Sequence, residues 1–125
     1  GWRGVVAGVA PATVEVLRSL RGGRVLAAIG PCISAEQFEV GPEVAASFAG
    51  AFPGEAARLV LPHPAPGKSR IDLKEALRVQ LLRAGVEAID IRGECTVALP
   101  ELFFSHRRDR GVSGRMVGLI GPRAG

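Results

Sequence analysis

The chain has 125 residues, which suits one hydrophobic core and is too short for two ordinary domains. Its hydrophobic content of 47% excludes a disordered chain, yet no apolar run approaches the roughly 20 residues of a membrane-spanning helix. The formal net charge is +4, but aromatic residues make up only 5%, so neither nucleic acid nor a membrane is the expected partner.

The first half of the chain predicts two helices with a strand between them. Residues 5–20 carry apolar side chains at helical spacing, with Pro11 either in the first turn or at a kink. Residues 21–23 (RGG) end this helix. Residues 24–30 form a short apolar run before Gly-Pro, which predicts a strand buried on both faces. The next helix is expected to begin near Pro42, because proline is tolerated in a first turn.

The second half predicts another strand, one well-defined helix and two further strands. A short strand and a proline-rich loop are expected within residues 58–70. Asp72 and Glu75 form a capping signal that begins the helix, and Gly85 ends it. Its apolar residues at helical spacing are Leu73, Leu77, Leu81 and Ala84. Strands are predicted at residues 86–93 and 115–121, so the fold class is α/β or α+β with mixed β-sheets flanked by helices.

Residues 103–115 (FFSHRRDRGVSGR) are the strongest candidate for a binding site. Phe103 and Phe104 are expected to anchor the segment in the core, while Gly111 and Gly114 let backbone amides approach a ligand. Four arginines would project from it: Arg107, Arg108, Arg110 and Arg115. Arginine binds phosphate oxygens in pairs, so the pattern predicts an anion pocket. The alternative is a surface loop of solvated charges that are paired through Asp109.

Other reactive side chains give weaker signals. Ser105 and His106 are adjacent, but neighbours in an extended segment point to opposite faces, which argues against a nucleophile and base pair. Cys32 follows a predicted strand, a place that suits a nucleophile, although a buried structural thiol is the commoner case; Cys95 is equally ambiguous. Cys32, His63, Cys95 and His106 carry atoms that bind zinc but lack the short spacing of zinc motifs.

Two distant cysteines, with no Cys-x-x-Cys pair, fit a reduced protein. The first residues also lack the pattern of a signal peptide. A cytoplasmic location is therefore expected.

Several segments together resemble one protein family. They are GWRG at residues 1–4, AIGPCIS and FEVGPEV within residues 28–44, IDL at 71–73, Cys95-Thr96, and FFSHRRD and SGRM within 103–116. They are similar, in this order, to the YfiH-like group, also called the multicopper polyphenol oxidoreductase or laccase-domain family, which includes the bacterial peptidoglycan editing factor. His106 stands where that family usually has Tyr, and Phe38 where Tyr is frequent.

The resemblance implies an α/β fold with mixed sheets and a zinc-dependent enzyme of purine nucleosides. The implied reactions are phosphorolysis of adenosine, inosine and methylthioadenosine, with adenosine deamination alongside, so the expected partners are a purine nucleoside and phosphate. Older naming implies copper and the oxidation of phenols. By matching positions, Arg3, Arg107, Arg108 and Arg115 are assigned to phosphate or substrate contact.

The metal ligands that the resemblance implies lie outside this chain. They are a His in a Val-His-Gly segment, a Cys in an Ala-Asp-Cys-Leu-Pro segment and a His two residues before Gly1. No metal ligand is assigned within the chain, and the catalytic residues stay unassigned. Residues 1–125 are interpreted as the C-terminal portion of a single domain of this family whose N-terminal part is missing.

Two alternatives to the phosphorylase remain. One is a peptidoglycan editing hydrolase that removes a misincorporated amino acid from a muropeptide precursor. The other is a non-catalytic fragment without a metal site. In a partial sheet, exposed apolar edges would favour self-association.

Overall fold

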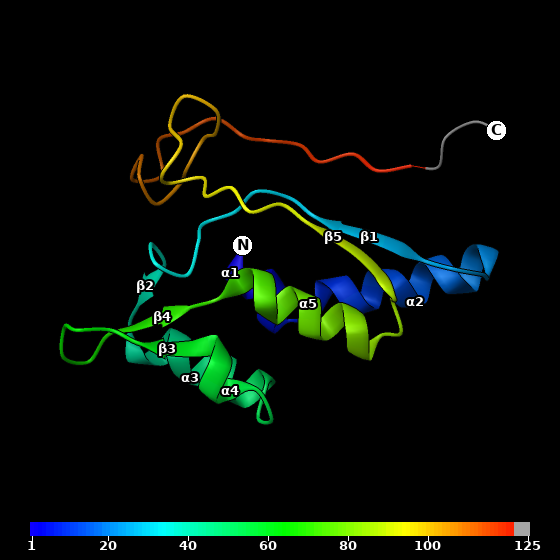
Figure 1. Ribbon diagram of the computed structural model, residues 1–125, viewed down its shortest axis with the longest axis horizontal. Coiled ribbons are helices and arrows are strands. Elements are labelled where there is room, and N and C mark those ends of the chain that lie inside the picture. The colour runs from blue at the N-terminus through cyan, green and yellow to red at the C-terminus, as the bar shows by residue number, and fades with distance from the viewer. Residues whose placement is uncertain (122–125) are drawn as a thin grey trace.

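Five helices and five strands make up the part of the chain that the computed structural model describes, residues 1–121. The helices are α1 (Trp2–Val6), α2 (Val9–Arg21), α3 (Pro42–Ala51), α4 (Ala56–Leu59) and α5 (Leu73–Arg83). The strands are β1 (Leu26–Ile29), β2 (Glu39–Val40), β3 (Val60–Pro62), β4 (Ser69–Ile71) and β5 (Ala88–Ile91). β1 and β5 pair in parallel, while β2, β4 and β3 form an antiparallel sheet in that order (Figure 1). The predicted mixed α/β class is confirmed.

The N-terminal helical segment is two helices, so the single helix predicted over residues 5–20 is wrong. Gly8 separates α1 from α2 with a φ of 76°, a left-handed conformation that glycine adopts without strain. Pro11 lies in the first turn of α2, where its missing N–H is not needed. Gly22 and Gly23, both with positive φ, follow α2 as predicted.

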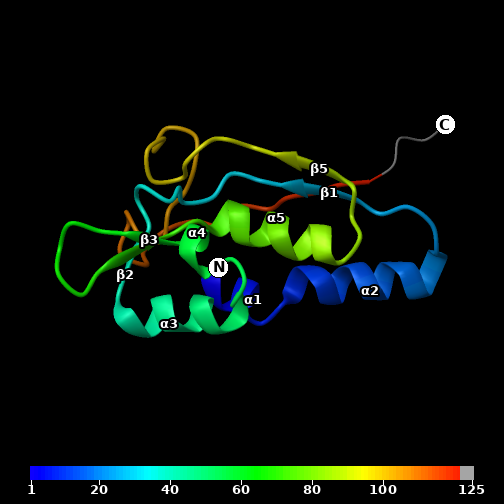
Figure 2. The same cartoon turned by 60° about the horizontal axis from the view of Figure 1, so that its bottom comes forward.

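Only one face of β1 is buried, which corrects the prediction of a strand buried on both faces. Ile29 is buried, whereas Leu26 and Ala28 are exposed. The reason is that β1 belongs to a two-stranded sheet, and α5, with α2 beside it, lies along one side of that pair (Figure 2).

α5 lies between two apolar clusters and contacts both. The larger cluster joins α3, α4, β4 and α5 and includes Phe48, Phe52, Leu59, Ile71 and Ala76. The smaller joins α2, β1 and α5 and includes Val14, Ile29, Leu81 and Val86. Leu77 packs against both clusters. α5 therefore buries Ala76 and Val79 in addition to the predicted Leu73 and Leu81.

Local hydrogen bonds fix both ends of α5. The Asp72 carboxylate accepts a hydrogen bond from the Glu75 backbone N–H at 2.9 Å, which confirms the predicted cap. At the other end Gly85 donates to the Leu82 carbonyl and Val86 to the Leu81 carbonyl, a Schellman arrangement. Gly85 has a φ of 77°, as this turn requires. The predicted start of α3 at Pro42 is also confirmed.

The strand predicted at residues 115–121 does not form. This segment makes no backbone hydrogen bond within the described chain, and most of its apolar side chains face solvent. A strand needs a partner, and none of residues 1–121 supplies one here. None of the helices in the same range has the length and apolar character needed to span a membrane.

Replacing Gly85 with alanine tests the turn after α5. A Cβ there would lie 3.1 Å from Arg18 Nη2, on a backbone that L-residues disfavour. We expect Gly85→Ala to lower the free energy of unfolding by about 1–2 kcal/mol, measured by urea denaturation. Gly50→Ala in α3 is the control, since a Cβ there meets nothing within 4 Å, and it should raise stability by up to about 1 kcal/mol. Equal effects of the two changes would contradict this account.

Candidate functional site

A cleft of about 670 Å³ opens between α1, the loop after β1 and the loop before Arg108. Aromatic rings and positively charged side chains line it, including Trp2, Arg3, Phe38, Phe104 and Arg107. Leu73 at the start of α5 and the buried Thr96 and Ser105 also contribute to the wall. Neither Asp nor Glu is among the described residues that line the cleft. Its chemistry therefore suits an anion joined to a flat apolar group.

Arg3 and Arg107 are the two predicted site residues that the structure brings to this cleft. The Arg3 guanidinium carbon lies 4.7 Å from the centre of the Trp2 ring, and that of Arg107 lies 5.3 Å from the Phe38 ring. Arg107 also donates a hydrogen bond to the Glu39 carbonyl at 2.9 Å. Within residues 1–121 neither guanidinium forms an ion pair. Both keep N–H groups that an incoming anion can use.

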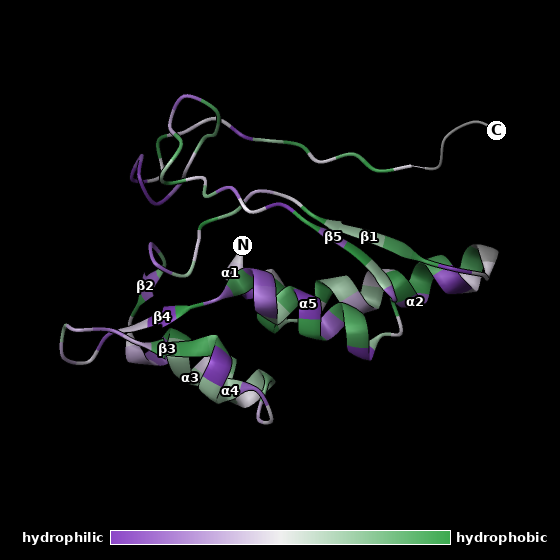
Figure 3. Ribbon diagram, viewed as in Figure 1, coloured by the Kyte–Doolittle hydropathy of each residue, from purple (hydrophilic) through white to green (hydrophobic). Residues whose placement is uncertain are grey.

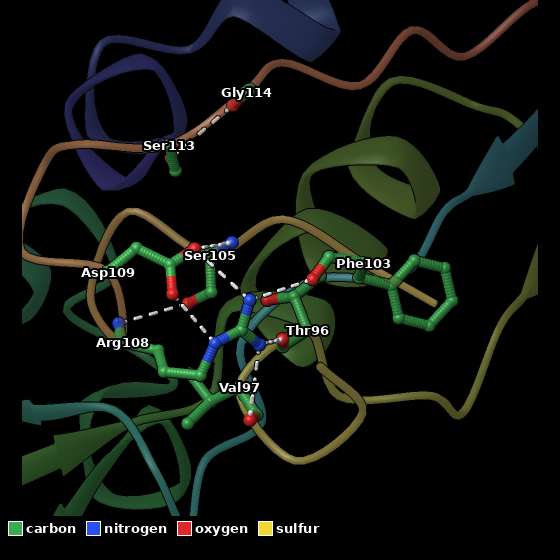
Figure 4. A network of polar contacts seen from close by, with 8 residues as sticks. All are labelled: Thr96, Val97, Phe103, Ser105, Arg108, Asp109, Ser113 and Gly114. Atoms are coloured by element: carbon green, nitrogen blue, oxygen red, sulfur yellow. Dashed lines mark hydrogen bonds and ion pairs between the residues drawn. The ribbon is translucent and has the colours of Figure 1, made fainter. Parts of the chain in front are cut away.

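Arg108 is not among the described residues that line the cleft, and its side chain joins two chain segments (Figure 4). Its guanidinium donates to the Thr96 carbonyl at 2.8 Å, the Phe103 carbonyl at 2.9 Å and the Asp109 carboxylate at 2.8 Å. These contacts use Nε and both terminal nitrogens. Arg108 therefore fixes the loop that carries Arg107, and the substrate contact predicted for it stays a prediction without support from its placement.

Asp109 closes the turn in which Arg107 and Arg108 lie. Its carboxylate accepts a hydrogen bond from the Ser105 backbone N–H, while the Ser105 hydroxyl accepts one from the Arg108 N–H. The hydrogen bond from the Arg108 guanidinium, reinforced by the Ser105 N–H, lowers the pKa of the Asp109 carboxyl. Arg108 is thus paired with Asp109, as the second interpretation of this segment expected, whereas Arg107 lines the cleft and the anion pocket stays a prediction.

Arg115 lies outside the set of residues that line the cleft. Its side chain is exposed, and among residues 1–121 its hydrogen bonds are to the Ser113 and Gly114 carbonyls, at 3.4 and 3.5 Å. The neighbouring Met116 lines the cleft instead. The anion contact predicted for Arg115 stays a prediction.

Phe104 is a cleft residue, and its predicted role as a core anchor is wrong. Its ring is about half exposed and packs over Gly114, where an added Cβ would lie 2.6 Å from ring carbons. Because Gly114 has no side chain, it leaves room for this ring. Gly111, with a φ of 82°, serves the turn after Arg110. Sequence reasoning named Phe38 only as part of the family pattern and did not predict that it lines the cleft.

Ser105 and His106 do not form a nucleophile and base pair. Ser105 is buried, His106 is exposed at the rim of the cleft, and no hydrogen bond joins their side chains within the described chain. The alternation argument from sequence predicted the same separation.

Cys32 and Cys95 face each other across an isolated parallel β-bridge, and both are free thiols. Burial raises the pKa of Cys32, which the nearby Lys74 offsets only in part. Burial also acts to raise the pKa of Cys95, but hydrogen bonds from Ser34 and from the Val97 and Ala98 backbone outweigh it, so the net pKa is lowered. Cys32 lines the cleft, and its raised pKa disfavours the thiolate that would act as a nucleophile.

No group of three or more His, Cys, Asp or Glu side chains that could hold a metal ion occurs in residues 1–121. His63 instead contacts the Glu39 carboxylate at 3.1 Å and accepts a hydrogen bond from Ala65. The four residues considered for a zinc site within the chain are therefore not gathered into one. The described residues do not fit the zinc or copper centre that the resemblance implies.

Replacement of Arg108 tests its role in fixing the loop. Arg108→Gln leaves the Thr96 and Phe103 carbonyls without their charged donor, so we expect a loss of about 1–3 kcal/mol in the free energy of unfolding. Arg115→Gln is the matched control and should change stability by less than about 0.5 kcal/mol in the same thermal or urea denaturation. If both variants unfold alike, Arg108 does not have this role.

The two cysteines should differ in their reaction with iodoacetamide. Because the pKa of Cys95 is lowered and that of Cys32 is raised, Cys95 holds more thiolate at any given pH. We expect alkylation of Cys95 to reach half its maximal rate at a lower pH than alkylation of Cys32, measured by mass spectrometry. Cys32→Ser and Cys95→Ser variants assign each rate, and a reversed order would contradict the geometry.

Comparison with known proteins shows which family and which relatives the chain is similar to. Residues 1–123 match the family model described as multi-copper polyphenol oxidoreductase laccase. Over 98% of this chain, 40% of residues are identical to "Purine nucleoside phosphorylase YlmD" of Geobacillus stearothermophilus, and 42% to "Purine nucleoside phosphorylase" of Deinococcus radiodurans. "Adenosine deaminase RL5", from an unknown prokaryotic organism, is 40% identical over 92% of the chain.

These relatives are longer than this chain. The matched part is 46% of the Geobacillus protein, 47% of the Deinococcus protein and 45% of RL5. The crystal structure of the Geobacillus protein superposes with a TM-score of 0.78 over 91% of this chain and 44% of that one, at 39% identity. The chain thus spans about half the length of the relatives it matches. A family match over nearly every residue shows that the chain belongs to the multi-copper polyphenol oxidoreductase laccase family.

Proposed function

We propose that this chain forms the phosphate- and nucleoside-binding part of an enzyme that cleaves purine nucleosides by phosphorolysis. The observation that carries the proposal is the cleft in which Arg3 and Arg107 lie beside aromatic rings, with no carboxylate among the lining residues that the structure describes. Relatives that are about 40% identical are named purine nucleoside phosphorylases, which supports the same assignment.

The cleft offers complementary groups for both parts of such a substrate pair. The unpaired N–H groups of Arg3 and Arg107 suit the oxygens of phosphate, which bind guanidinium in a planar fork. The Trp2, Phe38 and Phe104 rings offer flat apolar surface for a purine base. A volume of about 670 Å³ lies in the usual range for small-molecule sites.

The implied zinc ion belongs to residues outside those described here. Because residues 1–121 contain no suitable ligand group, no catalytic step is assigned to a metal in this chain. We propose that the ligands lie in the part of the family's polypeptide that this chain does not match. The chain's own contribution is to bind and orient the nucleoside and phosphate.

Adenosine deamination is the second candidate. One relative of comparable identity is named an adenosine deaminase, and the same cleft would hold adenosine. The two reactions differ in their need for phosphate and in the product, which is a free base in one case and ammonia in the other.

Activity is best measured on a chimera in which this chain replaces the matching part of the Geobacillus protein. With zinc present, we expect adenine and hypoxanthine to be released from adenosine and inosine only when phosphate is added, as followed by liquid chromatography. Ammonia release without phosphate would favour deamination. Release of L-serine from a muropeptide precursor, without base release, would favour the editing hydrolase.

The proposed contact between Arg107 and phosphate can be tested in the same chimera. We expect Arg107→Gln to raise the KM for phosphate by about tenfold to a hundredfold, the factor expected on losing a hydrogen bond between charged groups. Arg110→Gln is the control, because Arg110 lies in the same loop but outside the cleft lining and should leave this KM unchanged. A KM for phosphate that is the same in both variants would remove Arg107 from the phosphate site.

A further inference from the structure

Cys32 and Cys95 form a pair of thiols that the proposed function does not use. They are the two cysteines of the chain, and both are free and partly buried. β1 and β5 pair in parallel up to Ile29 and Ile91, and the segments that follow them meet again at the bridge between Cys32 and Cys95. The fold therefore places two thiols that are distant in sequence at directly opposite positions.

The spacing at this bridge suits a disulfide. Neighbouring strands lie about 4.8 Å apart, and side chains at paired positions of parallel strands project from the same face. Disulfides join residues whose Cα atoms are about 4.4–6.8 Å apart. The bridge thus brings Cys32 and Cys95 within the range in which a disulfide forms without a large movement of the backbone.

Hydrogen bonds hold both segments in place. The Thr96 backbone N–H donates to the Cys32 carbonyl at 3.2 Å. The Lys74 ammonium group on α5 donates to the Glu94 carbonyl at 2.9 Å, which ties the segment that carries Cys95 to the helix. Closing a disulfide here would therefore order little additional chain.

The surroundings of the two thiols give them different chemical roles. Burial acts to raise the pKa of Cys95, but hydrogen bonds outweigh it, including one from the Ser34 backbone N–H to Cys95 Sγ at 3.3 Å. Cys32 packs against the larger apolar cluster, and Figure 3 shows mainly hydrophobic residues along β1, the strand that leads to it. Cys95 is therefore the thiol that is better suited to attack an oxidant, and Cys32 is the one that completes the disulfide.

We propose that Cys32 and Cys95 form a redox site at which a hydroperoxide, such as hydrogen peroxide, converts the two thiols into an intramolecular disulfide. The Cys95 thiolate attacks one peroxide oxygen, so an S–O bond forms while the O–O bond breaks, and the leaving hydroxide takes up a proton. The Cys32 sulfur then attacks the sulfenic sulfur of Cys95. The S–S bond forms, the S–O bond breaks, and the second hydroxide leaves with the Cys32 proton. Two thiols are oxidised by two electrons, and the peroxide is reduced to two molecules of water.

The disulfide would join two parts of the cleft wall. Cys32 and Thr96 both line the cleft, and Cys95 directly precedes Thr96. Cross-linking therefore prevents these two segments from moving apart, whichever reaction the cleft serves. In a reducing compartment such a disulfide is transient and acts as a sensor of oxidants.

Peroxide treatment followed by mass spectrometry tests the site. We expect hydrogen peroxide to remove two hydrogen atoms from the monomeric chain and to give a peptide that joins Cys32 to Cys95, both reversed by dithiothreitol. In Cys32→Ser, dimedone should trap the Cys95 sulfenic acid at least tenfold faster than it labels Cys32 in the control Cys95→Ser. Disulfide-linked dimers without the internal cross-link, no cross-link at all, or faster labelling of Cys32 overturns the proposal.

A redox equilibrium gives a second readout that needs no variant. In mixtures of reduced and oxidised glutathione, we expect the equilibrium constant for the internal disulfide to be at least tenfold larger in the folded chain than in urea. The fold holds the thiols at paired positions, whereas the unfolded chain must close a long loop. An equal or smaller constant in the folded chain overturns the proposal.

The chimera extends the test to the whole enzyme. The same cross-linked peptide is expected from the peroxide-treated chimera, and its absence there overturns the site. A chimera that forms the disulfide but releases no base contradicts the proposed function and leaves the redox site standing.

Discussion

The packing of α5 between two apolar clusters is the interaction on which the rest of the structure depends. The two sheets share no strand, and α5 contacts elements on both sides of the molecule through Leu77 and its neighbours. Hydrogen bonds at Asp72 and at Gly85 fix where the helix begins and ends. Leu73, in its first turn, lines the cleft, so the position of α5 also sets one part of the wall of the candidate site.

The adjacent residues Arg107 and Arg108 have different roles at that site. The Arg107 guanidinium lies over the Phe38 ring at the cleft. The Arg108 guanidinium instead donates its hydrogen bonds to the Thr96 and Phe103 carbonyls and to the Asp109 carboxylate. A guanidinium whose N–H groups are already bound to the protein has little left for a ligand. The presence of four arginines in one loop therefore says less about binding than the partners that each one finds.

Local signals in the sequence predicted local structure well. The Asp72 cap, the start of α3 at Pro42 and the turn at Gly85 depend on residues within a few positions, and each is confirmed. The predictions for β1, for residues 115–121 and for Phe104 concern burial or pairing, which depend on distant parts of the chain. Periodicity cannot show whether the second face of a strand will be covered by the rest of the chain. It also could not predict that Arg107 lines the cleft while the adjacent Arg108 is hydrogen-bonded within the chain.

The contact between Gly114 and the Phe104 ring limits which residues can replace this glycine. The Phe104 ring occupies the space that any side chain at position 114 would need. A larger residue would have to push the ring aside, and the ring is part of the cleft wall. Variation at position 114 would thus alter the width of the cleft without touching Arg3 or Arg107, so the shape of the site and its charge can evolve separately.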